Sequence, residues 1–330
     1  MAKMKRLEKL EGVGNVQMVE VDMPSPGPQD ALVKVNRSLI SRGSELFARY
    51  VKEQAVSPES MGYSDSGAVV EVGPEVTDIK KGARAMVQAP HAQYVVRPAA
   101  GAQEQIFVLP EGLSHETATF MPLANGAVAW SRATPINPGD TVVVLGQGLV
   151  GNLYAQAVRA RNPGKIIVVD ATDLRCGIAA DCGAQTVLNA ATTDTVEAIK
   201  ELTGGRGAEV VVECVGGNAG IKSFEQAQQM LSRGGIIHLI SKYQAGDGVP
   251  GSGLLPLDSG IMQGCQIVFG YWNEPEPRVH YEDTAQMLLD GRIDVAPIIT
   301  HRLPWEQTAE AYHMLFNSPQ EALGVIIEWE

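Results

Sequence analysis

Three glycines form the strongest chemical motif of the chain. The stretch "VVVLGQGLVG" places Gly146, Gly148 and Gly151 in a G-x-G-x-x-G pattern, after an apolar run and at the start of a helical one. The first glycine allows a tight turn, the second lets the backbone approach a pyrophosphate, and the third lets helix and strand pack closely. Because free N–H groups at a helix start bind phosphate, the pattern predicts a dinucleotide site.

An acidic residue indicates which dinucleotide binds. Asp170 ends the next strand-like run, "KIIVVD". Its carboxylate is placed to accept hydrogen bonds from the ribose hydroxyls and to repel a 2′-phosphate. Arg175 follows at a helix start, where it could accommodate that phosphate or stack on the adenine. The acid that ends the strand outweighs it, so we expect NAD(H) in preference to NADP(H).

Apolar runs alternate with helical segments from about residue 141. The strand-like runs are "TVVVL", "KIIVVD", "TVL", "EVVVE" and "GIIHLI", and helices are expected near 149–161, 174–182, 193–202 and 219–231. This alternation indicates βαβ units and a parallel sheet that is buried on both faces. The predicted fold class is α/β, with a Rossmann doubly wound sheet that carries the glycine motif.

The first third of the chain has a different pattern. Short β-like runs are separated by Pro/Gly clusters such as "MPSPGPQD" and "VGPEVTDIKKG", which favours a compact β-barrel-like domain. At 330 residues the chain is too long for one ordinary core. We therefore expect a catalytic domain over 1–121, a nucleotide-binding domain over 122–269, and a final segment, 270–330, that completes the catalytic domain.

The composition and net charge limit the kinds of partner that the protein can bind. A net charge of -12 and a pI near 5.0 argue against a nucleic-acid or anionic membrane surface. The start of the chain lacks the apolar region of a signal peptide, and no run approaches the roughly 18 apolar residues of a membrane span. Four cysteines without a CxxC pair favour reduced thiols. We expect a cytoplasmic protein that acts on a small molecule.

The whole chain resembles the medium-chain dehydrogenase/reductase superfamily. The resemblance rests on the glycine motif and on "GYSDSGAVVEVGPEVTDIKKGARAMV", "LPEGLSHETATFMPLANGAVAW" and "LTGGRGAEVVVECVG". It implies a GroES-like β-barrel-type catalytic domain, a Rossmann domain, an active-site cleft between them, and a homodimer or homotetramer. It also implies cofactor contacts at Asn125, Leu149, Val150, Cys214, Val215, Ser241, Lys242 and Phe269.

The catalytic zinc site of that family is altered in this sequence. Arg42 in "ISRGSEL" stands where the family has a cysteine ligand, Tyr63 in "GYS" where it has the histidine of "GHE", and Met121 where it has an acid or cysteine. Zinc is bound by Cys, His, Asp or Glu, so these residues predict no metal. The four-cysteine lobe is missing from 86–100, where His91 stands at a loop-to-strand boundary and a structural role is expected.

Another group must then stabilise the charge that zinc would stabilise. Arg42 could hold an oxyanion or a substrate carboxylate, and Tyr63 could donate or accept the proton. Ser44 falls where the family carries a proton-relay Ser or Thr. In the alternative interpretation Arg42 only pairs with Glu45 or Asp65, and Tyr63 only fills the volume of the lost metal site. The sequence leaves both interpretations open.

Three functions are compatible with these patterns. The leading hypothesis is a zinc-independent, NAD(H)-dependent oxidoreductase that moves a hydride between nicotinamide and an alcohol or ketone, including polyol- or sugar-derived substrates. The first alternative is an NAD(P)H-dependent quinone or enoyl reductase that acts on C=C bonds. The second, from a different class, is a non-catalytic dinucleotide-binding sensor or interaction protein, because the glycine motif by itself indicates binding only.

Overall fold

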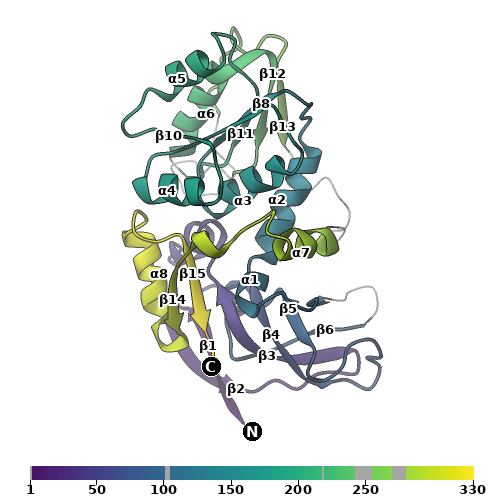
Figure 1. Ribbon diagram of the computed structural model, residues 1–330. Helices are drawn as coiled ribbons and strands as arrows, with labels where there is room; N and C mark the ends of the chain where they lie inside the picture. Colours follow the sequence, from purple (N-terminus) through teal and green to yellow (C-terminus); the bar gives the residue numbers. More distant parts are fainter. Residues whose placement is uncertain (1, 101–104, 218, 242–254, 270–279) are drawn as a thin grey trace. The chain divides into compact units, whose positions relative to one another are not determined.

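The computed structural model describes residues 2–100, 105–217, 219–241, 255–269 and 280–330. It divides into two compact units, each described by itself (Figure 1). The β-rich unit comprises Met1–Pro122, Tyr281–Asp290 and Ile299–Glu330, and the parallel-sheet unit comprises Leu123–His280 and Gly291–Ile298. The boundary expected at 269/270 adjoins residues outside the described part and stays a prediction.

The parallel-sheet unit contains a six-stranded sheet in the order β10-β9-β8-β11-β12-β13, and every neighbouring pair is parallel. Its strands are β8 (Thr141–Leu145), β9 (Lys165–Asp170), β10 (Thr186–Asn189), β11 (Ala208–Glu213), β12 (Leu231–Leu239) and β13 (Gln266–Phe269). Its helices are α2 (Met121–Ala133), α3 (Leu149–Arg159), α4 (Asp173–Asp181), α5 (Thr195–Leu202) and α6 (Ala219–Met230), with η4 (Ala296–Ile298). The predicted α/β class with a Rossmann-like parallel sheet is confirmed.

The middle residues of the central strands are all apolar because helices cover the sheet on both faces. Val142, Val143 and Val144 of β8 are fully buried, as are the three valines of β11. Phe224 and Met230 of α6 pack into the same core. The apolar runs in the sequence therefore locate strands that alternating patterns would have missed.

The register brings the carboxyl ends of the strands into one row. Leu145 of β8 pairs with Val169 of β9 and with Glu213 of β11. Glu213 pairs in turn with Leu239 of β12, and Leu239 with Phe269 of β13. The chain runs outward from β8 to β10 and returns to the other side of β8 at β11, so a topological switch point lies between β8 and β11. Ligands of such sheets bind at that edge.

The β-rich unit contains a seven-stranded sheet and a two-stranded hairpin. The larger sheet has the order β14-β15-β3-β4-β5-β7, with β6 also paired to β3, and β1 pairs with β2. Its strands are β1 (Lys3–Lys9), β2 (Val16–Asp22), β3 (Asp30–Leu39), β4 (Asp65–Val72), β5 (Arg84–Val87), β6 (Tyr94–Pro98), β7 (Ile106–Val108), β14 (Ile299–Pro304) and β15 (Gly324–Glu328). Its helices are η1 (Arg42–Tyr50), η2 (Pro58–Ser60), α1 (His115–Ala118), α7 (Tyr281–Leu289), η5 (Trp305–Gln307) and α8 (Thr308–Asn317).

The element η1 is a π-helix of nine residues. It follows β3 directly, and it buries Glu45, Leu46 and Tyr50 on one side. Single-turn π segments are frequent at functional sites. The sequence patterns predicted no helix in this segment.

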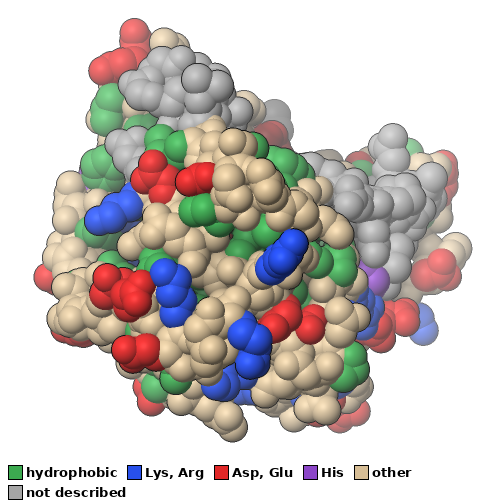
Figure 2. Space-filling model, turned by 90° about the horizontal axis from the view of Figure 1, so that it is seen from above, with side chains coloured by type: hydrophobic (Ala, Val, Ile, Leu, Met, Phe, Trp, Pro, Cys, Tyr) green, Lys and Arg blue, Asp and Glu red, His purple; other side chains and the backbone are tan. Residues whose placement is uncertain are grey.

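Charged side chains of both signs are interspersed on the face drawn in Figure 2. The described residues of that face form no patch of a single charge sign. Like the acidic composition, this gives no support for a nucleic-acid-binding surface. Among the described residues, no helix combines the length and apolar character needed to cross a membrane.

Candidate active site

The glycine motif forms the turn between β8 and α3. Gly146 has a φ of +85°, and a Cβ at this position would lie 2.9 Å from the side chain of Val215. A Cβ on Gly151 would lie 1.8 Å from the carbonyl oxygen of Gly146, so helix and turn are in direct contact. A Cβ on Gly148 would meet nothing within 4 Å. The open space at Gly148, at the N-terminus of α3, is where a pyrophosphate would approach the backbone.

Asp170 is nearly buried at the end of β9. Its Oδ2 accepts the N–H of Gln147 at 2.7 Å, and its Oδ1 accepts the N–H and the hydroxyl of Thr172, both at 2.9 Å. Arg175 Nη1 lies 3.7 Å from Oδ2. The acid therefore connects the glycine turn to the end of β9. Arg175 offsets part of its charge, a role that neither sequence interpretation of Arg175 included.

Glu213 is a site residue that the sequence reasoning missed. It is fully buried at the end of β11. Its Oε1 accepts the N–H of Val215 at 2.8 Å, and its Oε2 accepts the hydroxyl of Ser241. Its carbonyl oxygen accepts the N–H groups of Ile240 and Ser241. Glu213 thus joins two predicted cofactor residues, and an acid that ends the run "EVVVE", as Asp170 ends "KIIVVD", is a signal that could have found it.

The other predicted cofactor residues are spread along the same unit. Cys214 follows β11 and donates its N–H to Leu145 at 2.9 Å, while Leu149 and Val150 open α3. Asn125 is buried in α2. Phe269 ends β13 with 66% of its surface exposed. Lys242 lies outside the described residues.

The β-rich unit brings together two of the three predicted catalytic residues. The hydroxyl of Tyr63, between η2 and β4, donates to Ser41 Oγ at 2.5 Å. Ser44 Oγ, in η1, lies 3.5 Å from the same phenol oxygen. Ser41 itself is nearly buried, and Tyr63 is half-buried. This group of three hydroxyls can accept and pass on a proton.

Arg42 is held by contacts of a different kind. Its Nε donates to the carbonyl oxygen of Leu315 in the last turn of α8, at 3.2 Å. Its guanidinium carbon lies 5.1 Å from the centre of the Phe47 ring. A cation is favoured at the C-terminus of a helix and over an aromatic face. The charge of Arg42 is therefore fixed against η1 and α8.

Known proteins with similar sequences and folds are dehydrogenases. Residues 150–278 match the family model described as zinc-binding dehydrogenase. L-threonine 3-dehydrogenase of Pyrococcus abyssi is 27% identical over 348 residues, with 95% of each chain covered, and sorbitol dehydrogenase of Bacillus subtilis is 27% identical over 351 residues, with 94% covered. The solved alcohol dehydrogenase TADH from Thermus sp. ATN1 has a TM-score of 0.82 and 25% identity, over 98% of this chain and 99% of that one.

The chain is an oxidoreductase, similar over nearly its whole length to named threonine, sorbitol and alcohol dehydrogenases. In the parallel-sheet unit, the glycine turn, Asp170 and Glu213 all lie at the carboxyl ends of the strands, the edge at which sheets of this kind bind their ligands.

The family model is described as zinc-binding, so the donor set of this oxidoreductase decides whether zinc fits. The phenol of Tyr63 has two serine hydroxyls beside it, Arg42 carries a positive charge, and Met121 offers only a thioether at the buried start of α2. Protein zinc sites use thiolate, imidazole and carboxylate ligands. Within the described part of the chain, no group of three or more His, Cys, Asp or Glu residues is arranged to hold a metal. The three positions do not fit zinc.

Proposed function

We propose that this protein is a zinc-independent, NAD(H)-dependent dehydrogenase that interconverts an alcohol and a ketone. The observation that carries the proposal is the cluster of three hydroxyls from Tyr63, Ser41 and Ser44, in which Tyr63 occupies a position where the resemblance implies a zinc ligand. The relatives named threonine and sorbitol dehydrogenase support a small hydroxyl-bearing substrate, with polyol- and sugar-derived alcohols as candidates.

Alcohol oxidation requires that a hydride leaves the carbon and a proton leaves the oxygen. The nicotinamide, when bound, accepts the hydride. Tyr63 takes the proton from the substrate hydroxyl while its own phenol proton passes to Ser41 Oγ, the acceptor 2.5 Å away. The hydroxyl proton of Ser41 passes on to water in the same step, so that each oxygen of the relay keeps one proton. In the reverse direction the phenol returns a proton to the ketone oxygen. Arg42 is proposed to stabilise the developing oxyanion with its fixed positive charge.

The proposed preference for NAD(H) rests on Asp170. Its carboxylate is fixed at the carboxyl edge by the N–H groups of Gln147 and Thr172. A carboxylate in that place accepts hydrogen bonds from ribose hydroxyls and repels a 2′-phosphate. Arg175, 3.7 Å from the acid, weakens this repulsion without reversing it, because the acid is the residue anchored to the glycine turn.

We also propose that the protein acts as a cytoplasmic homodimer or homotetramer. Support for the assembly comes from β13, the last strand of the described parallel sheet, which ends in the exposed Phe269. An unpaired sheet edge that carries a large exposed apolar side chain favours association. Support for the compartment comes from the four cysteines, all free thiols.

The central test is Tyr63→Phe, which deletes the hydroxyl and keeps the ring. The assay follows NADH absorbance with a panel of alcohols, polyols, ketones, enones and quinones. We expect turnover to fall at least about tenfold, the lower end of what a general acid or base contributes, with an unchanged Kd for NADH. Near-normal turnover of Tyr63→Phe would refute the role of Tyr63.

Two further measurements separate the alternatives. Metal analysis of the purified protein is expected to find no stoichiometric zinc, and one zinc per chain would contradict zinc independence. Activity confined to enones or quinones would favour the C=C reductase, whereas tight NADH binding with no turnover of any compound in the panel would favour a sensor.

A further inference from the structure

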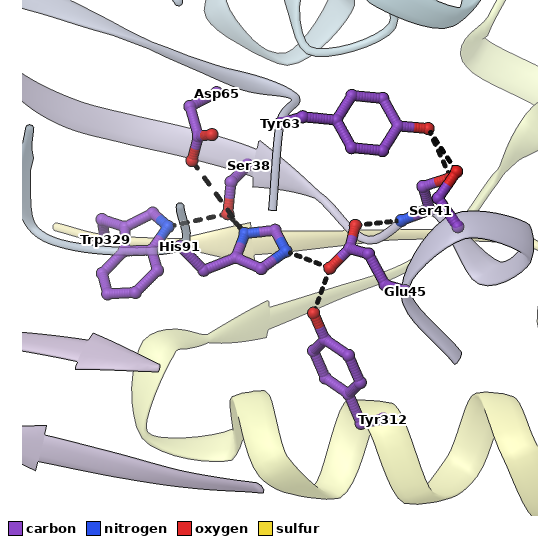
Figure 3. Close-up of polar contacts among 9 residues, drawn as sticks. Ser38, Ser41, Glu45, Tyr63, Asp65, His91, Tyr312 and Trp329 are labelled. Atoms are coloured by element: carbon purple, nitrogen blue, oxygen red, sulfur yellow. Dashed lines mark hydrogen bonds and ion pairs between the residues drawn. The ribbon is translucent and has the colours of Figure 1, made fainter. Parts of the chain in front are cut away.

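A buried polar cluster lies behind Tyr63 in the β-rich unit (Figure 3). Its side chains come from β3, η1, the start of β4, the segment before β6, α8 and the residue after β15. Three of its members carry a carboxyl or imidazole group and are fully buried, Glu45, Asp65 and His91. The remaining members are Ser38, Tyr312 and Trp329.

The hydrogen bonds of this cluster converge on one carboxylate. His91 Nε2 donates to Glu45 Oε2 at 3.0 Å, and the hydroxyl of Tyr312 donates to the same oxygen. The other imidazole nitrogen, Nδ1, lies 2.8 Å from Ser38 Oγ, which also accepts the indole N–H of Trp329 at 2.9 Å. The imidazole is therefore fixed at both nitrogens, and it fixes Glu45 in turn.

Opposing influences act on the imidazole of His91. Burial opposes its protonation, but the neighbouring carboxyl groups, Glu45 first and Asp65 second, raise the pKa of His91 above its ordinary value. Burial raises the pKa of Asp65 well above its usual range, and burial likewise raises the pKa of the Tyr312 phenol. Glu45 and His91, 3.0 Å apart, form a buried ion pair when the imidazole is protonated.

The second carboxylate oxygen of Glu45 bonds to Ser41, the hydrogen-bond partner of Tyr63. Glu45 Oε1 accepts the backbone N–H of Ser41 at 2.8 Å, and the N–H of Glu45 donates to the carbonyl of Ser41 at 2.9 Å. This resembles a capping box, in which the returning carboxylate stands three residues after the cap. Here it stands four residues after Ser41.

Ser41 is therefore held on two sides. Its backbone is bonded to Glu45, and its Oγ accepts the phenol of Tyr63. A buried ion pair is weak support for stability, because apolar replacements of equal volume are often neutral or stabilising. We propose that Glu45 and His91 are positioning residues: the ion pair fixes Ser41, and Ser41 fixes the phenol of Tyr63. The catalytic importance of this positioning rests on the proposed function.

The test labels the tyrosine ring at ¹³Cζ and follows the resonance of Tyr63 by NMR. The chain has 8 tyrosines, and the resonance that disappears in Tyr63→Phe identifies the signal. Glu45→Gln keeps the shape of the side chain and removes its charge. We expect it to move the Tyr63 resonance and to lower kcat about tenfold with little change in KM, because a displaced proton-transfer group slows the chemical step.

A double-mutant cycle shows whether Ser41 carries the effect. Ser41→Ala alone is expected to move the Tyr63 resonance, and Glu45→Gln added to Ser41→Ala is expected to move it no further. The matched control is Tyr50→Phe, which deletes another hydroxyl in η1, one that bonds to His313 Nδ1 at 2.7 Å. We expect this control to leave the Tyr63 resonance in place.

An unmoved Tyr63 resonance in Glu45→Gln would overturn the proposal, and so would additive shifts in the cycle. If Glu45→Gln does not fold, Tyr312→Phe takes its place, because it removes one hydrogen bond from the same carboxylate. An unmoved Tyr63 resonance, or additive shifts with Ser41→Ala, would overturn the proposal in that variant as well. These results are independent of the reaction. Full activity of Tyr63→Phe would refute the proposed function and leave the positioning measured by NMR intact.

Discussion

Because of the buried imidazole of His238, we expect the folded protein to lose stability in mild acid. It is fully buried in β12, where its Nδ1 lies 2.6 Å from Thr134 Oγ1. The single proton of that threonine hydroxyl goes to the carbonyl of Trp130, and the hydroxyl of Tyr154 also points at Oγ1. His238 Nδ1 must therefore carry a proton, which leaves Nε2 as a bare, buried nitrogen without a partner among the described residues.

Burial accordingly lowers the pKa of His238 to about 4, from an ordinary value of 6.5. The unfolded chain binds the proton more tightly, so this contribution to the free energy of unfolding is complete above pH 6.5 and is lost as the pH falls towards 4. A displacement of this size corresponds to about 3 kcal/mol in full, and to about 2 kcal/mol between pH 8 and pH 5.

The assay is urea unfolding of the wild type and of His238→Phe at pH 8 and pH 5, followed by tryptophan fluorescence. Phenylalanine keeps a planar ring and cannot titrate, so the other ionisable groups act equally in both proteins. We expect the wild type to lose about 2 kcal/mol more than the variant between the two pH values. Equal losses would refute the assignment of a bare, buried imidazole.

Three further predictions concern the parallel-sheet unit. Asp170→Ser should lower the ratio of NADH affinity to NADPH affinity about tenfold, because a charged hydrogen bond to the ribose is lost. A wild-type protein that already binds NADPH more tightly than NADH would contradict this prediction. Gly148→Ala should weaken NADH binding and leave Tm unchanged, because the added Cβ meets no protein atom. Gly151→Ala should lower both the affinity for NADH and Tm, because its Cβ would lie 1.8 Å from the carbonyl oxygen of Gly146. Equal Tm values for the two variants would contradict this difference. Phe269→Glu should reduce the particle mass in light scattering, and an unchanged mass would exclude this residue from the assembly contact.

Local patterns predicted much of the parallel-sheet unit. The strands and helices from Thr141 to Leu239 follow the apolar runs, because a sheet covered on both faces needs them. The turn at Gly146 and the acid at Asp170 are one strand apart, so neighbouring residues determine their arrangement.

The β-rich unit was less predictable because its site depends on distant partners. Glu45 bonds to His91 and Tyr312, and Arg42 bonds to Leu315, all from separate parts of the chain. The sequence indicated a structural role for His91 and could not show that this role passes through Ser41. Pairings of this kind have no periodic signal, and they become visible only when the strands are placed.

The pairing of β3 with β15 has a consequence for the order of folding during synthesis. β3 precedes the parallel-sheet unit in the chain and β15 follows it, with Leu39 opposite Ile326. The sheet of the β-rich unit can therefore close only after β15 has emerged from the ribosome, by which time the parallel-sheet unit has already been made. A nascent chain stalled near residue 300 would carry a folded nucleotide-binding unit beside an open sheet edge, a natural substrate for chaperones.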